Sequence, residues 1–285
     1  MNKLSDIGTI KDILKRHGFT FSKALGQNFL INPSVCPRMA ELSGAGEGVG
    51  VIEVGPGIGV LTNELCKLAD KVVAIELDKR LLPVLDETLA EYGNVKVINA
   101  DVLELDLNKL IADEFPGMEV VICANLPYYI TSPVIMKLLE DRLPVKAITV
   151  MVQKEAAQRI CAPVGSRESG AVTVSVNYYA EPSLQFHVSA GSFMPAPKVD
   201  SAVIRLDIRE NPPVETDEKM FFSVVKAAFS QRRKVISNSL SSGLKMSKDE
   251  INGILERAQV PANARAERLS LEDFAKIANE VQNDK

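Results

Sequence analysis

Three glycines alternate with other residues in the segment 53–59, Glu-Val-Gly-Pro-Gly-Ile-Gly, directly after a short apolar run. Because glycine has no Cβ, such a turn lets the backbone bend tightly and approach a ligand closely. Glu76 follows Gly55 by 21 residues, at the end of the next apolar run. A carboxylate at that place can accept hydrogen bonds from both hydroxyls of a ribose. Taken alone, this turn is as typical of a tight turn with only a structural role as of a ligand-binding turn. Together with Glu76, it favours a cofactor that contains a nucleoside.

Two further polar signals follow the next two apolar runs. Asp101 follows one of them, where its carboxylate could accept a hydrogen bond from an adenine amino group or cap a helix. The segment Asn125-Leu-Pro-Tyr128 follows the other, and Pro127 stiffens this turn. The Asn125 side-chain oxygen and a neighbouring backbone carbonyl then form two acceptors in fixed geometry beside the Tyr128 ring. An exocyclic amine on a flat base needs these groups, so the segment predicts a base pocket.

Phe193 lies in a loop, residues 191–201, that two prolines hold extended. We expect its ring at the edge of the site, and the alternative is that it belongs to the core. Four cysteines stand at positions 36, 66, 123 and 161, and the only histidines are His17 and His187. None of the cysteines has CxxC spacing, so the sequence predicts neither a disulfide framework nor a metal site. We interpret Cys123 as a packing residue, His187 as structural and His17 as a helix-end residue.

The elements that must position these residues alternate along the chain. Apolar runs predict strands at 50–54, 72–76, 95–99, 119–125 and 146–152. Helical patterns lie between them at 60–69, 78–92, 106–112 and 132–140. Such alternation predicts an α/β fold with an open, mostly parallel sheet, since parallel sheets bury both faces of their strands.

The flanking segments are less regular. The pattern of residues 5–17 predicts a helix with Ser5 as its cap. Residues 19–30 have no clear period, so we expect a loop there. Pro33 suits the first turn of a further helix, which Asn32 would cap. After residue 153 we expect one helix, then strands at 184–188 and 202–208. The composition changes at 211–218, with two prolines, and we place a domain boundary there. The prediction is a catalytic domain over 1–210 and a small all-helical domain over 211–285, with helices near 218–230, 233–241, 247–258 and 270–281.

Composition and charge narrow the class of protein. Hydrophobic residues make up 46% and charged residues 25% of the 285, which excludes an intrinsically disordered chain. The longest uncharged run, 120–136, contains two prolines and an asparagine and is no membrane span. No secretory apolar stretch opens the chain, so we expect a cytoplasmic protein. The net charge is −4, yet residues 222–268 carry nine basic and four acidic side chains, so one basic face could still bind a polyanion.

Seven segments in sequential order resemble those of one family. They are LGQNFL (25–30), EVGPGIGVLT (53–62), IELD (75–78), NADVLELD (99–106), ANLPYYITSP (124–133), FMPAPKVDSAVIRL (193–206) and AFSQRRKVISNSL (228–240). The chain resembles the ribosomal RNA adenine N6,N6-dimethyltransferases, and most closely their bacterial small-subunit branch. The resemblance implies a methyltransferase-type, Rossmann-like domain, S-adenosylmethionine as cofactor and a helical C-terminal domain. It further implies dimethylation of two adjacent adenosines in the 3′-terminal hairpin loop of 16S rRNA, as part of ribosome biogenesis, by a monomer that binds the small subunit or its precursor.

The resemblance also implies roles for particular residues. The implied cofactor contacts are Gln27, Asn28, Leu30, Gly55, Gly57, Gly59, Glu76, Leu77, Asp101, Val102 and Asn125. The implied catalytic pocket for the target base comprises Asn125, Leu126, Pro127, Tyr128 and Phe193. Because the net charge is negative, local basic surface must bind the RNA, and the candidates are Arg232, Arg233 and Lys234 together with the basic residues 1–40. The alternative is that Arg232 and Arg233 pack against the catalytic domain or cap helices.

Three alternatives stay open from the sequence. One is the related large-subunit rRNA methyltransferase group that confers macrolide resistance, although the loop 195–203 and the C-terminal helices look more like the housekeeping branch. A second is a DNA adenine-N6 methyltransferase, against which the segment 228–234 argues. A third is an assembly factor that binds rRNA without catalysis, against which the intact glycine turn, Glu76 and Asn125 argue.

Overall fold

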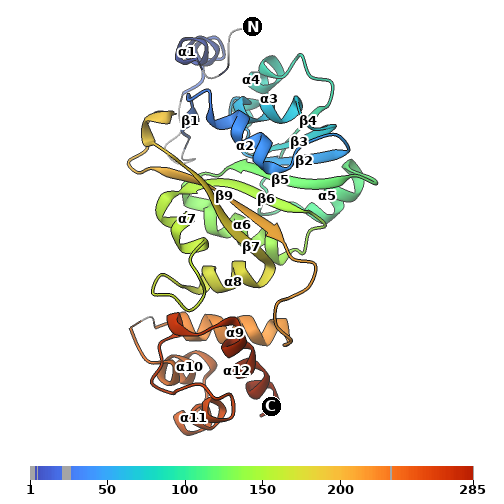
Figure 1. Cartoon of the computed structure of the whole chain (residues 1–285). Helices are drawn as coiled ribbons and strands as arrows, with labels where there is room; N and C mark the ends of the chain where they lie inside the picture. Colours follow the sequence, from blue (N-terminus) through green and yellow to red (C-terminus); the bar gives the residue numbers. More distant parts are fainter. Residues whose placement is uncertain (1–3, 5, 21–26, 232, 285) are drawn as a thin grey trace. The chain divides into compact units, whose positions relative to one another are not determined.

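The computed structural model describes residues 4, 6–20, 27–231 and 233–284, and the chain divides into two compact units (Figure 1). The first unit comprises Met1–Ala157 and Ser183–Ile208, and the second comprises Gln158–Pro182 and Arg209–Lys285. The predicted boundary at 210 differs from this division, because the segment 158–182 packs with the C-terminal helices. The assignment of catalytic and helical domains stays a prediction.

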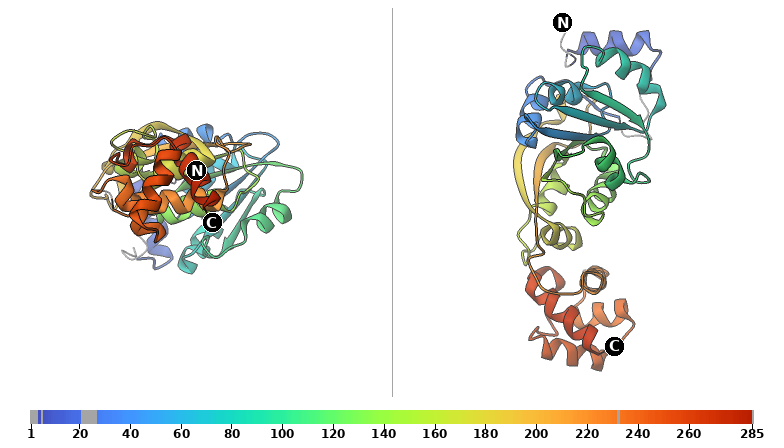
Figure 2. Two further views of the ribbon diagram at one scale, coloured as in Figure 1. Left: turned by 90° about the horizontal axis from the view of Figure 1, so that it is seen from below. Right: turned by 90° about the vertical axis from the view of Figure 1, so that its right-hand side faces the viewer.

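A seven-stranded sheet forms the centre of the first unit. Its strands are β2 (Val49–Val54), β3 (Lys71–Glu76), β4 (Val95–Asn99), β5 (Glu119–Asn125), β6 (Ala147–Gln153), β7 (Ala180–Val188) and β9 (Ser201–Ile208). Their order is β4-β3-β2-β5-β6-β9-β7; the first five are parallel, and β9 pairs antiparallel with β6. The strands rotate successively across the sheet (Figure 2), the usual twist of such sheets. This confirms the predicted open, mostly parallel α/β fold.

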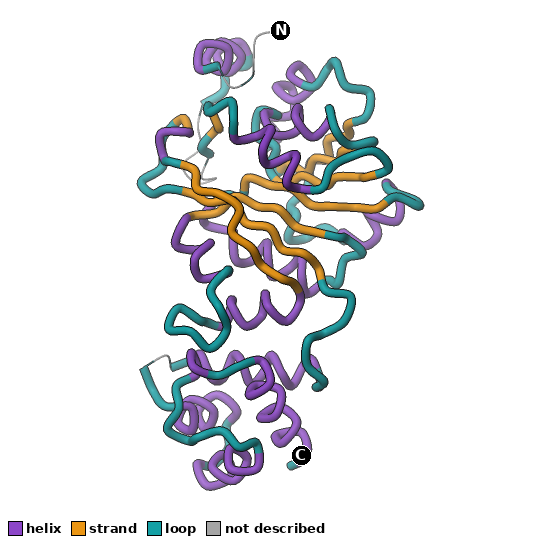
Figure 3. The backbone as a smooth tube through the Cα atoms, in the orientation of Figure 1, coloured by secondary structure: helices purple, strands orange, loops and turns teal. Residues whose placement is uncertain are grey.

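Helices cover both faces of the sheet (Figure 3). Those of the first unit are α1 (Ile7–Arg16), α2 (Val35–Ser43), α3 (Val60–Cys66), α4 (Leu82–Thr88), α5 (Leu107–Glu114) and α6 (Thr131–Glu140), with short 3₁₀ turns η1 (Lys79–Leu81), η2 (Tyr128–Ile130) and η3 (Ala190–Ser192). Each strand from β2 to β6 is mostly apolar, and β2, β3, β5 and β6 are almost fully buried. These strands need apolar cover on both faces, and the amphipathic helices between them supply it.

Several helix boundaries differ from the predicted ones for local reasons. Helix α1 is capped by Asp6, whose carboxylate accepts from the Thr9 amide, while Ser5 lies outside the described residues. Helix α2 begins at Val35 because the Asn32 side chain accepts from the Ser34 amide and forms a turn instead of a cap. The predicted helix 78–92 is a 3₁₀ turn followed by α4, which has a proline in its first turn.

A two-stranded sheet joins the N-terminal segment to the loop before β9. Strand β1 (Phe29–Leu30) pairs antiparallel with β8 (Phe193–Met194), in a segment for which the sequence predicted only a loop. The Ile31 amide also donates to the Ser192 carbonyl, at 2.8 Å. A strand of two residues has no periodicity, so the sequence could not indicate it.

The second unit is helical. Its helices are α8 (Ala171–Tyr179), α9 (Glu218–Phe229), α10 (Ile236–Leu244), α11 (Lys248–Arg257), α12 (Leu271–Asn283) and the turn η4 (Ala266–Arg268); α7 (Lys154–Ile160) leads into it from the first unit. The sequence predicted one helix after residue 153, but α7 and α8 are two. Tyr178 packs at 4.8 Å from the Phe221 ring, and Tyr179 stacks on Phe222, so aromatic packing attaches α8 to α9. The Tyr179 hydroxyl also donates to Glu218 at 2.7 Å.

Candidate functional site

A pocket of the first unit lies where the parallel strands end. The connection after β2, the end of β3, the turn after β4 and the end of β5 all contribute to its wall. The chain proceeds from β2 to β3 and β4 in one direction, and from β5 to β6 in the other. The pocket therefore lies at the topological switch point of the sheet, where open α/β folds bind their ligands.

The glycine turn after β2 has the backbone conformation that its sequence indicated. Gly55, Gly57 and Gly59 have φ values of 71°, 61° and 85°, a region that L-residues with a Cβ rarely adopt. A Cβ on Gly57 would lie 3.2 Å from Cε1 of Phe29, so the wall of the pocket is closed tightly there. Gly55 and Gly57 line the pocket.

Gly59 has a different position from the one expected of a cofactor contact. It caps the N-terminus of α3 and is absent from the residues that line the pocket. A Cβ on it would meet Thr88 at 3.1 Å and Leu89 at 3.2 Å, on the side of α4. The structure thus brings Gly55 and Gly57, but not Gly59, to the pocket wall, because Gly59 is the N-cap of α3 and faces Thr88 and Leu89.

Glu76 ends β3 with its carboxylate in the pocket wall. It is only 6% exposed. Its Oε1 accepts from the Asp78 amide at 2.8 Å and its Oε2 from the Gly57 amide at 3.3 Å. Burial raises the pKa of this carboxyl, while the amide donors of Asp78 and Gly57 lower it in part. These two amides fix the carboxylate in one orientation, as a ligand with two adjacent hydroxyls requires.

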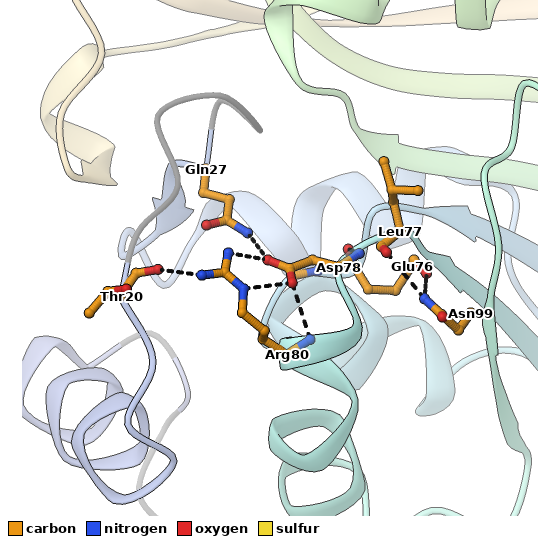
Figure 4. A network of polar contacts seen from close by, with 8 residues as sticks. Thr20, Gln27, Glu76, Leu77, Asp78, Arg80 and Asn99 are labelled. Carbon is orange, nitrogen blue, oxygen red and sulfur yellow. Dashed lines mark hydrogen bonds and ion pairs between the residues drawn. The ribbon is translucent and has the colours of Figure 1, made fainter.

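A polar network behind Glu76 ties the N-terminal segment to the site (Figure 4). Asp78 accepts from Nε2 of Gln27 at 2.8 Å and from Nη2 of Arg80 at 2.6 Å. The Arg80 guanidinium holds the pKa of the Asp78 carboxyl below its usual value. Arg80 also donates to the Thr20 carbonyl at 3.4 Å. Asp78 and Arg80 were not singled out from the sequence, although Asp78 belongs to the IELD segment. Gln27 and Asn28 line the pocket.

Asp101 and Val102 lie in the turn after β4 and line the same pocket. Oδ1 of Asp101 accepts from the Leu103 amide at 2.9 Å. This carboxylate therefore closes a turn and caps no helix, since α5 begins at Leu107 with Asp106 as its cap. Asn99 at the end of β4 donates to the backbone carbonyls of Glu76 and Leu77, which couples this turn to the end of β3 (Figure 4).

The segment after β5 presents its four residues to the pocket. The Leu126 amide donates to the Met151 carbonyl at 3.2 Å. The Pro127 carbonyl accepts from the Ile130 amide at 3.2 Å and from the Thr131 hydroxyl at 3.3 Å. These bonds start η2 and α6, so they hold Asn125 and its neighbours in a defined turn.

Tyr128 is fixed by a partner from a distant segment. Its hydroxyl lies 2.6 Å from Oγ of Ser201, the first residue of β9. Burial raises the pKa of the phenol, so Tyr128 is neutral over the physiological range. The ring is thereby oriented without carrying charge.

Phe193 is more deeply buried than a residue at the edge of a site, with 3% exposure. It pairs with Leu30 through β1 and β8, belongs to the same apolar cluster as Met39, and lines the pocket. Its neighbours Leu30 and Met39 are more than 150 positions away, so the sequence alone could not bring them together.

Glu53 also lines the pocket, although the sequence did not lead us to predict a role for it. It is 1% exposed, and burial raises the pKa of its carboxyl to about 8. The sequence signal that could have indicated a pocket residue is its position, because Glu53 is the acidic residue directly before the glycine segment.

The cysteines have no features of a nucleophile. All four are free thiols, and burial raises the pKa of Cys36, Cys66, Cys123 and Cys161. Cys123 is fully buried, as its packing interpretation predicted. Within the described parts of the chain, no group of His, Cys, Asp or Glu is arranged to hold a metal ion.

The predicted RNA contacts belong to the second unit. Arg233 and Lys234 are exposed, and Arg232 lies outside the described residues. In the same described ranges, no helix has the length and apolar character that crossing a membrane requires.

The strand order, the pocket at the switch point and its acidic residues after successive strands define a Rossmann-like methyltransferase fold. Solved structures agree. The chain is similar to a dimethyladenosine transferase from Plasmodium falciparum, with a TM-score of 0.75, 26% identity, and coverage of 90% of this chain and 98% of that one. It is also similar to the 23S rRNA methyltransferase ErmE, with a TM-score of 0.68, 28% identity, and coverage of 90% and 100%.

The chain belongs to the ribosomal RNA adenine dimethylase family, whose model matches residues 18–283. Among its relatives, "Ribosomal RNA small subunit methyltransferase A" of Alkaliphilus oremlandii is 46% identical over 99% of both chains. The protein of the same name from Shouchella clausii is 49% identical over 98% of this chain and 97% of its own. The protein is therefore an S-adenosylmethionine-dependent enzyme that dimethylates adenine in ribosomal RNA. The pocket fits this cofactor, because an oriented carboxylate suits a ribose and the acidic wall suits a cation.

Proposed function

We propose that this enzyme dimethylates two adjacent adenosines in the 3′-terminal hairpin loop of 16S rRNA, acting as a cytoplasmic monomer on the small ribosomal subunit or its precursor. The main structural support for the proposed adenine methylation is that one pocket is lined by Asn125–Tyr128, Phe193 and Glu76. The small-subunit substrate is supported by relatives of that name at 46–49% identity over nearly the whole chain. The 23S rRNA methyltransferase is 28% identical.

In this proposal the cofactor occupies the pocket between the glycine turn and the turn after β4. Glu76 accepts from the ribose hydroxyls, because its carboxylate is oriented by the amides of Gly57 and Asp78. Asp101 and Val102 receive the cofactor adenine. Gln27 contributes through its bond to Asp78, which joins the N-terminal segment to β3. Asn28 and Leu30 close the pocket from this segment, and Leu77, directly after β3, covers the adenine.

The target base enters beside Asn125. S-adenosylmethionine supplies an electrophilic methyl group on a sulfonium. The adenine N6 lone pair is delocalised into the ring, so N6 is a weak nucleophile until the lone pair is localised. The Asn125 oxygen and one backbone carbonyl accept the two N6–H groups, favour a pyramidal nitrogen and stabilise the positive charge that develops on it. After the methyl group is transferred, the N6 cation loses its proton to water without a catalytic base.

The hydrogen bonds of the turn favour one of the two carbonyls as the second acceptor. The Pro127 carbonyl already accepts from Ile130 and Thr131. We therefore assign the acceptor role to the Leu126 carbonyl, with Pro127 holding the turn. Tyr128, fixed through Ser201, and Phe193 offer ring faces on which the base stacks, and this holds N6 within reach of the methyl group.

The large-subunit alternative has one observation in its favour, the structural similarity to the 23S rRNA enzyme over 90% of the chain. One experiment distinguishes the small-subunit substrate from the large-subunit substrate. The enzyme is incubated with radiolabelled S-adenosylmethionine and with separated small and large subunits, both from a strain that lacks adenine dimethylation. We expect up to four methyl groups in each small subunit, mapped to two adjacent adenosines, and none in the large subunit. The Asn125→Ala variant is the control for transfer by this site. Label in the large subunit would contradict the proposed substrate, and binding without label would favour the assembly-factor alternative.

A further inference from the structure

Tyr129 is an exposed aromatic side chain at the rim of the pocket. It lines the pocket and is nevertheless 54% exposed. Among the large apolar side chains that are exposed in the described parts of the chain, it is the only aromatic one. The roles proposed above for the cofactor and for the target base do not use this ring. It is therefore an aromatic surface beside the site that is open to a further ligand.

The turn η2 directs Tyr128 and Tyr129 to different sides. Successive side chains of a 3₁₀ turn diverge by about 120°, because such a turn has three residues. Tyr128 is held through its hydroxyl by Ser201, so Tyr129 points elsewhere, and its exposure places it toward solvent. The bond from the Ile130 amide to the Pro127 carbonyl closes the turn. The Tyr129 ring is thus carried on a fixed backbone at the mouth of the pocket.

Tyr129 lies on the side of the pocket away from the proposed cofactor adenine. Leu77, directly after β3, is the other exposed large apolar residue in the pocket wall. Strand β2 separates β3 from β5, so their ends lie about 10 Å apart, twice the spacing of neighbouring strands. The cofactor adenine is placed near Leu77 and Asp101, whereas Tyr129 follows Asn125, beside which the target base enters. We therefore expect the ligand of Tyr129 to come from the RNA.

The proposed substrate offers such a ligand. A base that enters the pocket must leave its stack, and the next base then loses a stacking partner. An aromatic side chain can replace that partner, because every base has a π-face. Since the substrate has two adjacent adenosines, the one outside the pocket lies beside the entrance in each round. Methylation of N6 leaves the face of adenine intact, so the same ring can hold this neighbour before and after the neighbour is itself modified.

We propose that Tyr129 stacks on the adenosine next to the target and so holds the strand in its unstacked form while the target base occupies the pocket. The proposal rests on the proposed function, because it takes the small-subunit rRNA as the substrate. Tyr128 and Phe193 stack on the target base, whereas Tyr129 stacks on its neighbour. Tyr129 is then a positioning residue, since it contacts no reacting atom and acts by lowering the cost of extruding the target.

Single-turnover transfer to undermethylated small subunits, measured with the whole protein at limiting concentration, tests the role of the ring. Tyr129→Leu keeps an apolar side chain without an aromatic face and should lower the rate by roughly tenfold. Tyr129→Phe keeps the face and should retain the wild-type rate within about twofold. Leu184→Ala, at an exposed apolar residue of β7, is the matched control and should transfer at the wild-type rate.

Two further readouts show whether these variants change anything but RNA positioning. The affinity for S-adenosylhomocysteine, the demethylated cofactor, should be the same in all three variants and the wild type. The midpoint of thermal unfolding should also be unchanged, because Tyr129 and Leu184 are exposed and their truncation leaves no cavity in the core.

A second substrate tests whether the ring contacts the neighbouring base. Small subunits are reconstituted with rRNA in which uridine replaces one or the other of the two adenosines, and transfer to the remaining adenosine is measured. Uracil has the smaller ring system and stacks less strongly. On at least one of these substrates the wild type should lose about threefold or more in rate, and Tyr129→Leu should lose less than the wild type. A double-mutant cycle over the rates measures the coupling between the ring and the base.

Every other result overturns the proposal in a recognisable way. A wild-type rate for Tyr129→Leu would exclude stacking on this ring and leave the proposed substrate intact. Equal losses by the wild type and Tyr129→Leu on the uridine substrates would exclude contact with the neighbouring base. Weaker binding of S-adenosylhomocysteine by Tyr129→Leu would assign the ring to the cofactor, and an equal loss of rate in Tyr129→Phe would assign the role to the hydroxyl. Absence of transfer to small subunits by the wild type would contradict the proposed function itself.

Discussion

Two residues of the proposed base pocket have different surroundings, and their expected functions differ accordingly. Asn125 is partly exposed at the end of β5, whereas Phe193 is buried in an apolar cluster as well as lining the pocket. Replacing Phe193 by alanine would therefore combine a lost ring face with a cavity in the core. Leucine keeps most of the apolar volume and removes only the aromatic face, so it is the better test.

Asn125→Ala should lower the single-turnover rate by at least about a hundredfold, because it removes an acceptor that strengthens in the transition state. Phe193→Leu should lose stacking worth about 1–3 kcal/mol, a reduction in rate of roughly ten- to a hundredfold. Neither variant should weaken subunit binding, which phosphate contacts dominate. Filter binding beside single-turnover kinetics measures both quantities. Normal turnover by Asn125→Ala would refute the assigned mechanism.

At the scale of elements, the turn between β2 and α3 combines a half that lines the pocket and a half that packs against α4. The Gly57 amide holds the Glu76 carboxylate, and a Cβ there would press on Phe29 in the pocket wall. Gly59 instead faces Thr88 and Leu89. One glycine-rich segment thus lines the pocket at its start and packs α3 against α4 at its end.

Gly57→Ala and Gly59→Ala form a matched pair. Both place a Cβ at positive φ and should lower the free energy of unfolding by about 1–2 kcal/mol or more. Only Gly57→Ala should weaken S-adenosylhomocysteine binding strongly, by about tenfold, because it displaces Glu76 and Phe29. Denaturant unfolding and calorimetry provide the two readouts. If Gly59→Ala weakened the ligand equally, the division of the turn would be wrong.

At the scale of the whole molecule, charge is unevenly distributed along an acidic chain. The net charge is −4, but residues 222–268 carry five more basic than acidic side chains. Overall charge therefore opposes RNA binding, and local basic surface must supply the attraction. Arg233 and Lys234 are exposed members of this basic window.

Reversing both charges, Arg233→Glu with Lys234→Glu, should weaken binding to the small subunit and flatten its salt dependence by about one unit of slope per lost phosphate contact. Cofactor affinity should not change. Lys109→Glu with Lys146→Glu makes the same change in net charge at exposed positions of the first unit and serves as the control. Binding curves over a salt series compare the two. Equal slopes for both variants would exclude a specific docking role for Arg233 and Lys234.

The sequence by itself determined the alternation of strands and helices and the order of the polar segments. Apolar runs of five to seven residues and the glycine turn are local signals, and the parallel sheet follows from their repetition. The same rule predicted that Glu76, Asp101 and Asn125 share one edge, because the carboxyl ends of parallel strands meet there. The place of these three residues in the pocket was therefore predictable.

Only the tertiary structure decided features whose partners are distant in sequence. Strand β1 exists because residues 193–194 pair with it, and α10 begins at Ile236, three residues later than predicted, where the Ile236 amide donates to the Ala264 carbonyl. The burial of Glu53, the bond from Tyr128 to Ser201 and the place of Gly59 were equally inaccessible. Periodicity reports which face of an element is apolar, but what lies against that face depends on the folding of the whole chain.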